Sequence, residues 1–387
     1  MTTSKGFLSL VLHAHLPFVR HPEHADMMEE RWLFEAITET YIPLLEVFGK
    51  LVADGIKFRL TMSLTPPLLN MLADEMLVGR YSKHLSKLEE LAEKEVERTR
   101  WQPEFYATAL MYREKFKRIR GIFQSCDGNL IRLFKKYQNL GVLDIITCCA
   151  THAFLPLLSD FRPAVRAQIE MAVRDYQKHF DRAPRGIWLA ECAYNPGDDK
   201  ILSDFGIRYF FTDTHGILFA DPRPAYGVHA PVECPSGVLA FGRDVESSRQ
   251  VWSAHEGYPG DFAYREFYRD IGFDLEFDYI RPYIHESGHR LNTGIKYHRI
   301  TSRDGAEKQP YNYQEAMARV ATHAGHFIYC REQQMKHLNA IMDRPPIIVS
   351  PYDCELFGHW WYEGPAFIYH VLRKTSLESS AMQLGTP

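Results

Sequence analysis

The chain has 387 residues, of which 45% are hydrophobic and 24% are charged, and its formal net charge is −4. This composition is that of a folded globular protein, large enough for one big domain with insertions. The small negative charge, together with the lack of a long basic run, excludes an electrostatic surface for nucleic acid.

Cysteine usage and the N-terminal sequence bear on the cell compartment. Seven cysteines occur and no two are spaced as Cys-x-x-Cys, so a reducing compartment is favoured over a disulfide framework. The first apolar run covers only residues 7–12, which is too short for a signal peptide or a membrane span. We therefore expect a cytoplasmic protein with no membrane partner.

Short apolar runs alternate with helical patterns along the chain, as is typical of parallel strands joined by helices. The runs at residues 8–12, 58–62, 143–147, 186–189, 209–212, 238–241 and 347–349 predict seven strands. Amphipathic helices are predicted at residues 32–51, 163–179 and 313–338. The helical pattern at about residues 80–140, which ends near Gly141, predicts a helical insertion after the second strand.

Two long stretches show neither pattern. Residues 221–237 hold four prolines, and residues 252–311 are rich in aromatic side chains. Long loops inside a compact domain are often functional lids. We expect the first stretch to be mobile and to cover a cleft. Aromatic residues make up 13% of the chain, and we expect some of them to serve as flat platforms for sugar rings.

Polar side chains follow several of the predicted strands at the point where each strand ends. His13 and His15 follow the first strand, His152 the third, Glu191 the fourth and Asp353 the seventh. In a parallel α/β barrel all these ends open on one face, where active sites lie. Helix caps also favour acidic residues at such positions, so a capping role is the alternative.

Two carboxylates held about 5–5.5 Å apart define a retaining glycosidase, in which one attacks the sugar and the other carries a proton. Glu191 and Asp353 are the candidates, and a buried ion pair or a metal site is the alternative interpretation. His13, His15 and His152 fit three roles equally well: they can bind a divalent metal, contact sugar hydroxyls or cap the strands.

Several motifs occur in an order that matches one known family. They are His13-Ala-His-Leu-Pro17, Asp144-Ile-Ile-Thr-Cys-Cys-Ala-Thr-His-Ala-Phe-Leu-Pro156, Trp188-Leu-Ala-Glu-Cys-Ala-Tyr194, Gln250-Val-Trp-Ser-Ala254, Gly257-Tyr-Pro-Gly260 and Tyr352-Asp-Cys-Glu-Leu-Phe-Gly-His-Trp-Trp-Tyr-Glu-Gly364. On these motifs the chain resembles glycoside hydrolase family 57, and within it the α-1,4-glucan branching enzymes.

The resemblance implies an α/β fold, an incomplete seven-stranded (β/α)7 barrel that fills residues 1–387, and a retaining mechanism without metal or cofactor. Glu191 falls on the family's nucleophile and Asp353 on its acid/base. Substrate-binding positions implied by the motifs are His13, His15, Trp32, His152, Trp252, Trp360 and Trp361. Tyr226 is similar to the tyrosine at the tip of a lid loop in branching enzymes.

Two features depart from the family's pattern. Ala190 stands where related motifs often have proline. Similar branching enzymes continue into a helical C-terminal region, whereas this chain ends at Pro387, so we expect that region to be absent or truncated. The apolar side chains at residues 360–372 would then be partly exposed, which predicts self-association and an acceptor side open to water.

The expected function is that of a retaining transferase that cuts α-1,4 links and forms α-1,6 branches in glycogen or amylose. Within the same family, an α-amylase or a 4-α-glucanotransferase is the alternative. A metal-dependent carbohydrate deacetylase and a non-catalytic glucan-binding module are alternatives from other classes.

Overall fold

The computed structural model describes residues 6–252, 256–285, 287–302 and 307–387. Within these ranges, one sheet follows the order β6-β7-β5-β4-β3-β2-β1-β8, and β9 pairs with β1. The strands are β1 (Gly6–Ala14), β2 (Leu60–Leu64), β3 (Leu143–Cys148), β4 (Gly186–Trp188), β5 (Tyr209–Thr212), β6 (Val232–Glu233), β7 (Leu239–Gly242), β8 (Ile347–Asp353) and β9 (Met382–Leu384).

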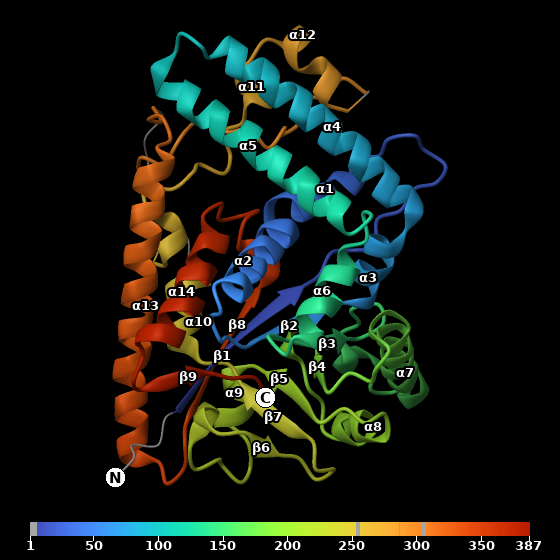
Figure 1. The fold of residues 1–387 in the computed structure, drawn as a ribbon. Helices are drawn as coiled ribbons and strands as arrows, with labels where there is room; N and C mark the ends of the chain where they lie inside the picture. The colour runs from blue at the N-terminus through green and yellow to red at the C-terminus, as the bar shows by residue number, and fades with distance from the viewer. Residues whose placement is uncertain (1–5, 253–255, 286, 303–306) are drawn as a thin grey trace.

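The sheet curls into an incomplete barrel (Figure 1). Along the path from β7 through β5, β4, β3, β2 and β1 to β8, every neighbouring pair is parallel. The two ends of this path approach each other just after β7, where the backbone N–H of Asp244 donates to the carbonyl of Val349 at 2.9 Å. The predicted fold class, an incomplete (β/α)7 barrel, is confirmed.

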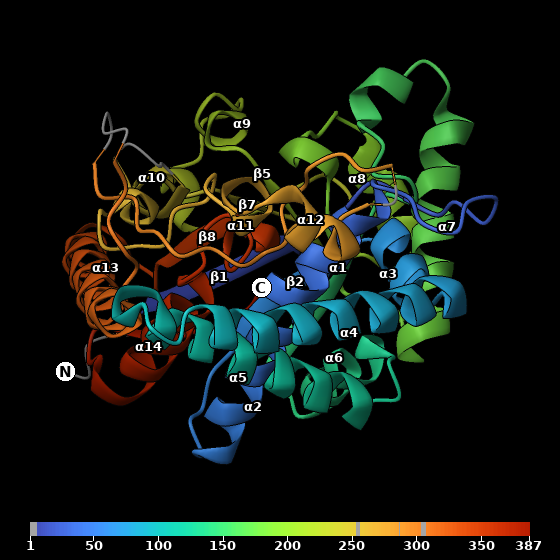
Figure 2. The same cartoon turned by 90° about the horizontal axis from the view of Figure 1, so that it is seen from above.

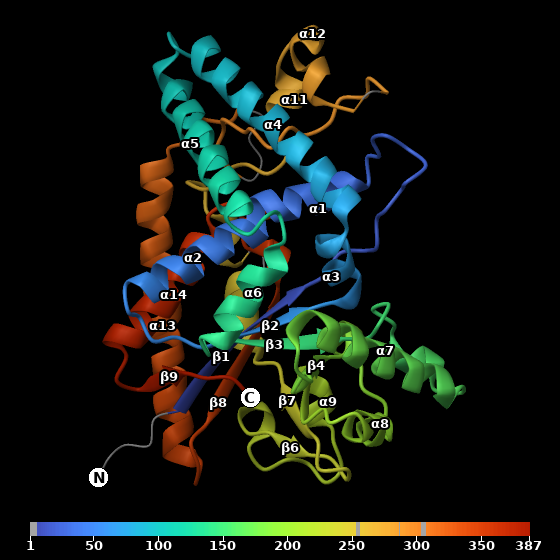
Figure 3. The same ribbon diagram turned by 45° about the vertical axis from the view of Figure 1, so that its right-hand side comes forward.

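Helices surround the sheet or extend beyond it (Figure 1), and none in the described part of the chain is long and apolar enough to cross a membrane. They are α1 (Glu30–Ala36), α2 (Ile42–Ala53), α3 (Pro66–Ala73), α4 (Glu75–Arg98), α5 (Pro103–Ser125), α6 (Leu130–Asn139), α7 (Arg162–Phe180), α8 (Asp198–Asp204), α9 (Thr214–Leu218), α10 (Val245–Trp252), α11 (Ile271–Asp274), α12 (Phe277–Ile280), α13 (Tyr313–Ile341) and α14 (Gly364–Glu378). Seen from above, α4 and α5 lie side by side (Figure 2). The α7 helix packs outside β3 (Figure 3).

Most predicted elements coincide with observed ones, and the differences have physical causes. β8 runs on to Asp353 because it is the last strand of the path, where Pro351 is tolerated although it has no N–H. β2 begins and ends two residues later than predicted and includes the buried polar residues Thr61 and Ser63. β6 and β9 are too short to carry an alternating pattern. The predicted helix at 32–51 is interrupted by a π-helical turn, Ile37–Tyr41.

The hydrophobic core has two parts. One lies around β1 and β2 and is closed by α2, α4, α13 and α14, and the other lies around β4, β5 and β7 with α7. The strands are buried on both faces, as parallel strands covered by helices must be. The strand ends are therefore held on a rigid base.

The apolar segment near the C-terminus is covered, so the expectation that it stays exposed is wrong. In α14, the side chains of Phe367, Ile368, Val371 and Leu372 are almost fully buried. The helix packs against α13 and α2, which come from distant parts of the sequence. Trp360 does remain exposed. Self-association stays a prediction, but the apolar patch on which it was based is not present at α14.

This packing predicts a large loss of stability when a buried side chain of α14 is shortened. Leu372→Ala should lower the free energy of unfolding by about 2–5 kcal/mol, because Leu372 is fully buried and its removal leaves a cavity. Leu377→Ala on the same helix is the matched control, since Leu377 is 56% exposed and should lose less than about 0.5 kcal/mol. Chemical denaturation measures both. Equal losses would show that α14 is not packed as described.

Candidate active site

The register of the sheet brings residues from the two ends of the chain together. In β1, His13 lies beside Asp353 of β8 on one side and beside Ser63 of β2 on the other. All three are at or near the carboxyl ends of parallel strands, so they share one mouth of the barrel. Glu191 reaches the same mouth from the turn after β4.

Glu191 sits on a strained backbone. It lies in a short 3-10 turn, Ala190–Cys192, with a left-handed conformation at φ 56° and ψ 26°, and Cys192 has φ 56° as well. Such conformations in residues other than glycine cost about 1–3 kcal/mol each and persist where the surroundings enforce them. Here the N–H of Cys192 donates to Leu189 (2.9 Å), and the hydroxyl of Thr212 donates to the carbonyl of Cys192 (3.2 Å). The turn leaves the side chain of Glu191 exposed.

Asp353 is placed to hold a proton. It is the last residue of β8, its side chain is exposed, and it lines the cleft. Burial raises the pKa of Asp353, the negative charge of Glu191 raises it further, and the positive charge of Arg243 lowers it. Two carboxyl groups that interact in this way favour one protonated and one ionised member. Their assignment as acid/base and nucleophile, and their separation, remain predictions.

Three neutral imidazoles line the mouth beside the carboxylates. His13 Nε2 and His152 Nε2 face each other at 3.0 Å, and the rings of His15 and His152 stack at 3.8 Å. Two further ring nitrogens lie 3.1 Å from hydroxyls, His13 Nδ1 from that of Ser63 and His15 Nδ1 from that of Thr65. Burial lowers the pKa of all three histidines, that of His15 to about 3.

These histidines give a test of the metal-free prediction. At neutral pH each ring carries one proton, so the short His13–His152 contact works as a hydrogen bond between a donor and an acceptor. We expect full activity after dialysis against a chelator, and no bound transition metal by mass spectrometry of the purified protein. Loss of activity on chelation, with recovery on adding zinc, would contradict this and favour deacetylase chemistry.

A cleft of about 710 Å³ opens beside Asp353. Aromatic side chains form its walls: Trp252, Phe267, Tyr268, Trp360 and Trp361. Trp252 and Trp360 are half-exposed, at 52% and 56%, so part of each ring is open to a ligand. Trp361 is buried against Tyr264 and Phe367 and serves as part of the cleft's base. Residues 253–254 of the Gln250–Ala254 motif lie outside the described residues.

The structure does not bring Tyr226 to this mouth, so the expectation of a lid at residues 221–237 is wrong for this structure. The Tyr226 ring lies 5.2 Å from Arg344, just before β8 begins. A strand advances roughly 3.3 Å per residue, so the two ends of β8 are about 20 Å apart. Trp32, also expected near the sugar, is 53% exposed on α1 and does not line the cleft.

Two residues of the mouth were not predicted from the sequence. Trp188, at the end of β4, stacks on His13 at 4.8 Å. Arg243 follows β7, donates to the sulfur of Cys192 at 3.5 Å, and has a buried Nε with no partner in the described part of the chain. Both sit at strand ends, which was the signal used for the histidines, but arginine and tryptophan are common in other roles at such positions.

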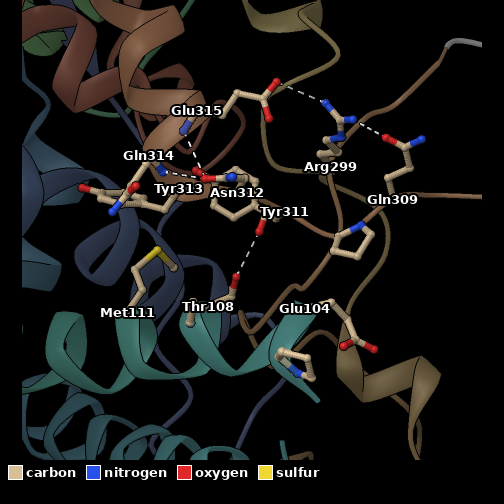
Figure 4. Close-up of a pocket in the computed structure, with 13 residues that line it drawn as sticks. Glu104, Thr108, Met111, Arg299, Gln309, Tyr311, Asn312, Tyr313, Gln314 and Glu315 are labelled. Atoms are coloured by element: carbon tan, nitrogen blue, oxygen red, sulfur yellow. Dashed lines mark hydrogen bonds and ion pairs between the residues drawn. The ribbon is translucent and has the colours of Figure 1, made fainter. Parts of the chain in front are cut away.

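Another cavity, of about 620 Å³, lies between the start of α5 and the start of α13 (Figure 4). Its polar side chains are largely paired with one another: Arg299 with Gln309 and Glu315, and Asn312 with the first backbone N–H groups of α13. Neither catalytic candidate lines it. The cleft beside Asp353 is therefore the candidate site for the predicted chemistry.

Fold and mouth together define a carbohydrate-active type of barrel, with paired carboxylates and an aromatic cleft at the carboxyl ends of its strands. The chain belongs to glycosyl hydrolase family 57, whose model matches residues 9–343.

Three similar proteins, at 35–53% identity, are named for two activities. A 1,4-alpha-glucan branching enzyme of Thermococcus kodakarensis is 36% identical, over 95% of this chain and 55% of its own length. The crystal structure of the alpha-amylase AmyC from Thermotoga maritima is 53% identical with a TM-score of 0.95, over 99% of this chain and 73% of that one. The structure of the branching enzyme from Pyrococcus horikoshii is 35% identical with a TM-score of 0.85, over 98% and 69%. The chain thus spans about half the length of the Thermococcus relative.

The position of Arg243 predicts a change in the pH dependence of activity. Because its positive charge lowers the pKa of Asp353, Arg243→Gln should raise that pKa. If Asp353 is the acid, as the motifs predict, it acts in its protonated form, so the alkaline limb of the kcat/KM profile should move to higher pH. Arg243→Lys keeps the charge and should move it less. An alkaline limb that stays in place in Arg243→Gln would show that Arg243 does not tune Asp353.

Proposed function

We propose that this chain is a retaining α-glucan enzyme that cuts α-1,4 links and transfers the released chain to form α-1,6 branches. The observation that carries the proposal is that Asp353 ends β8 and Glu191 follows β4 at one mouth of the barrel, beside an aromatic cleft. The names of the Thermococcus and Pyrococcus relatives support the branching specificity.

In the first step, Glu191 attacks the anomeric carbon while Asp353 donates its proton to the departing O4. The C1–O4 bond breaks, and a β-linked glycosyl ester forms on Glu191. Esterification removes the negative charge of Glu191. Since that charge raises the pKa of Asp353, its loss lowers this pKa, and Asp353 stays ionised after giving up its proton.

In the second step, Asp353 takes a proton from the 6-hydroxyl of an acceptor glucan. The oxygen attacks C1, the ester bond breaks, and Glu191 returns as a carboxylate. Two inversions preserve the α configuration. The positive charge of Arg243, which lowers the pKa of Asp353, favours the ionised form that this step requires.

Hydrolysis is a second candidate, favoured by two observations. The alpha-amylase AmyC is 53% identical, and the segment at 221–237 does not bring Tyr226 over the cleft. Without Tyr226 over the cleft, we expect water to compete with the acceptor for the glycosyl ester. The proposal predicts both products, with a substantial share of hydrolysis.

Incubation with amylose tests both candidates on one sample. New α-1,6 links are counted by proton NMR and new reducing ends by a colorimetric assay. We expect both to increase, and Glu191→Gln to lower both by about a thousandfold or more, because an amide cannot form the ester. Reducing ends without new branches would establish the hydrolase, and activity retained in Glu191→Gln would overturn the mechanism.

A further inference from the structure

The π-helical turn between α1 and α2 faces the segment that follows Asp353. This turn covers Ile37–Tyr41, and all five residues are buried. In a regular α-helix, successive side chains are rotated by about 100° around the helix axis, so three consecutive residues do not all face the same neighbouring segment. A π turn inserts an extra residue and is frequent at functional sites. Here three successive residues, Glu39, Thr40 and Tyr41, all contact residues 355–359.

Each contact fixes a different point of that segment. The Tyr41 hydroxyl donates to Glu355 Oε1 at 2.5 Å. The backbone N–H of His359 donates to the hydroxyl of Thr40 at 3.2 Å, and His359 Nδ1 lies 2.9 Å from Glu39 Oε2.

Gly358 makes the close approach to the π turn possible. It has φ 122°, and a Cβ there would lie 1.8 Å from the carbonyl oxygen of Glu39. A larger residue at this position would push the segment away from the turn, so the segment after Asp353 cannot shift without breaking several contacts.

Glu39 and His359 form an ion pair when the imidazole is protonated. Burial raises the pKa of Glu39, but the charges of Arg265 and His359 and the hydrogen bond to His359 lower it to about 2. Burial lowers the pKa of His359, but the hydrogen bond to Glu39 and the charges of Glu39 and Glu35 raise it overall, against the opposing charge of Arg265. Arg265 Nη1 lies 3.4 Å from Glu39 Oε1 and also donates to Tyr112.

The imidazole of His359 connects this ion pair to the cleft. Its ring meets Phe267 edge-on at 5.6 Å and Trp360 edge-on at 5.4 Å. Phe267 and Trp360 stack on each other at 4.6 Å with an angle of 21° between their planes. Both line the cleft beside Asp353. The orientation of these two rings therefore depends on where Glu39 holds His359.

The cleft is lined by Asp353 and not by Glu191. In a retaining mechanism the acid/base lies beside the oxygen that leaves, and later beside the oxygen of the acceptor. The stacked rings are accordingly on the leaving-group and acceptor side of the scissile bond.

We propose that Glu39 and His359 are positioning residues that hold Trp360 and Phe267 as a platform for the leaving and acceptor glucan beside Asp353. That the platform binds glucan rests on the proposed function, whereas the contacts that link Glu39 to Trp360 do not depend on it. Neither Glu39 nor His359 touches the reacting atoms in this account. Their effect passes through the two aromatic rings.

A double-mutant cycle with amylose as substrate tests the proposal. Glu39→Gln keeps the shape and removes the charge, and it should raise KM about tenfold while kcat changes less than about twofold. In the Trp360→Ala background the same change should raise KM less than about twofold, because the platform is already gone. Glu46→Gln on α2, where Glu46 pairs with Arg118 at the surface, is the matched control and should leave KM unchanged. An equal rise of KM in both backgrounds would overturn the proposal.

Two measurements without substrate separate this proposal from the proposed function. NMR titration of ring-labelled histidine should give His359 a pKa above that of free histidine, and Glu39→Gln should lower it. The difference in near-ultraviolet circular dichroism between the wild type and Trp360→Phe is the Trp360 signal, which reports how firmly this ring is oriented. The same difference, measured between Glu39→Gln and Glu39→Gln/Trp360→Phe, should be smaller. If wild-type protein leaves amylose intact, the proposed function fails and these spectra still decide the positioning role.

Loss of stability is controlled in the same experiment. Thermal unfolding of each variant is recorded, and His359→Asn provides a second variant that removes the ring contacts while Glu39 keeps Arg265. The Trp360 signal should shrink in His359→Asn as well. A Trp360 signal unchanged in both folded variants would overturn the proposal.

Discussion

The register between β1 and β8 is the constraint on which the site depends. These strands come from opposite ends of the chain, and their pairing places His13 beside Asp353. A slip of one residue would turn every side chain of β8 to the other face, moving Asp353 away from the mouth. β1 also pairs with β2, which supplies Ser63 to His13. The core around β1, α2, α13 and α14 keeps this register rigid.

Around that rigid base, the two carboxylates are held in different ways. Glu191 stands on a strained left-handed turn, held by a hydrogen bond within the turn and by another from Thr212 of β5. Asp353 ends a regular strand, and its protonation is governed by burial and by the opposing charges of Glu191 and Arg243. Strain and charge are thus concentrated at one edge of a sheet that is otherwise regular, as expected where catalysis requires a fixed geometry.

Much of the fold was predictable from the sequence, because parallel strands covered on both faces are continuous apolar runs. The runs at 143–147 and 209–212 match β3 and β5 almost residue for residue. Their polar ends indicated the mouth, and the motifs supplied Glu191 and Asp353. What the sequence did not reveal depends on packing between distant segments. Proline content at 221–237 resembled a lid, but the contact of Tyr226 with Arg344 is tertiary.

The same reason explains the other errors. The sequence near the C-terminus predicts that the side chains of α14 are exposed. In the structure they are buried, because α13 and α2, which are distant in sequence, cover them. The π turn at Ile37–Tyr41 has no pattern that separates it from an ordinary helix, and its contacts are made with residues more than 300 positions away. Arg243 carries no motif of its own and acquires a role only through its proximity to Asp353 and Cys192.

The central claim is that Glu191 forms a covalent ester with the sugar while Asp353 carries the proton. A fluorinated α-glucosyl fluoride, which forms the ester quickly and releases it slowly, allows a direct measurement. After incubation, intact-protein mass spectrometry and peptide mapping locate the label. The account predicts one sugar per chain, attached to Glu191, with no label in Glu191→Gln. A label on another residue, or turnover of the reagent to a β-configured product without a label, would contradict the account.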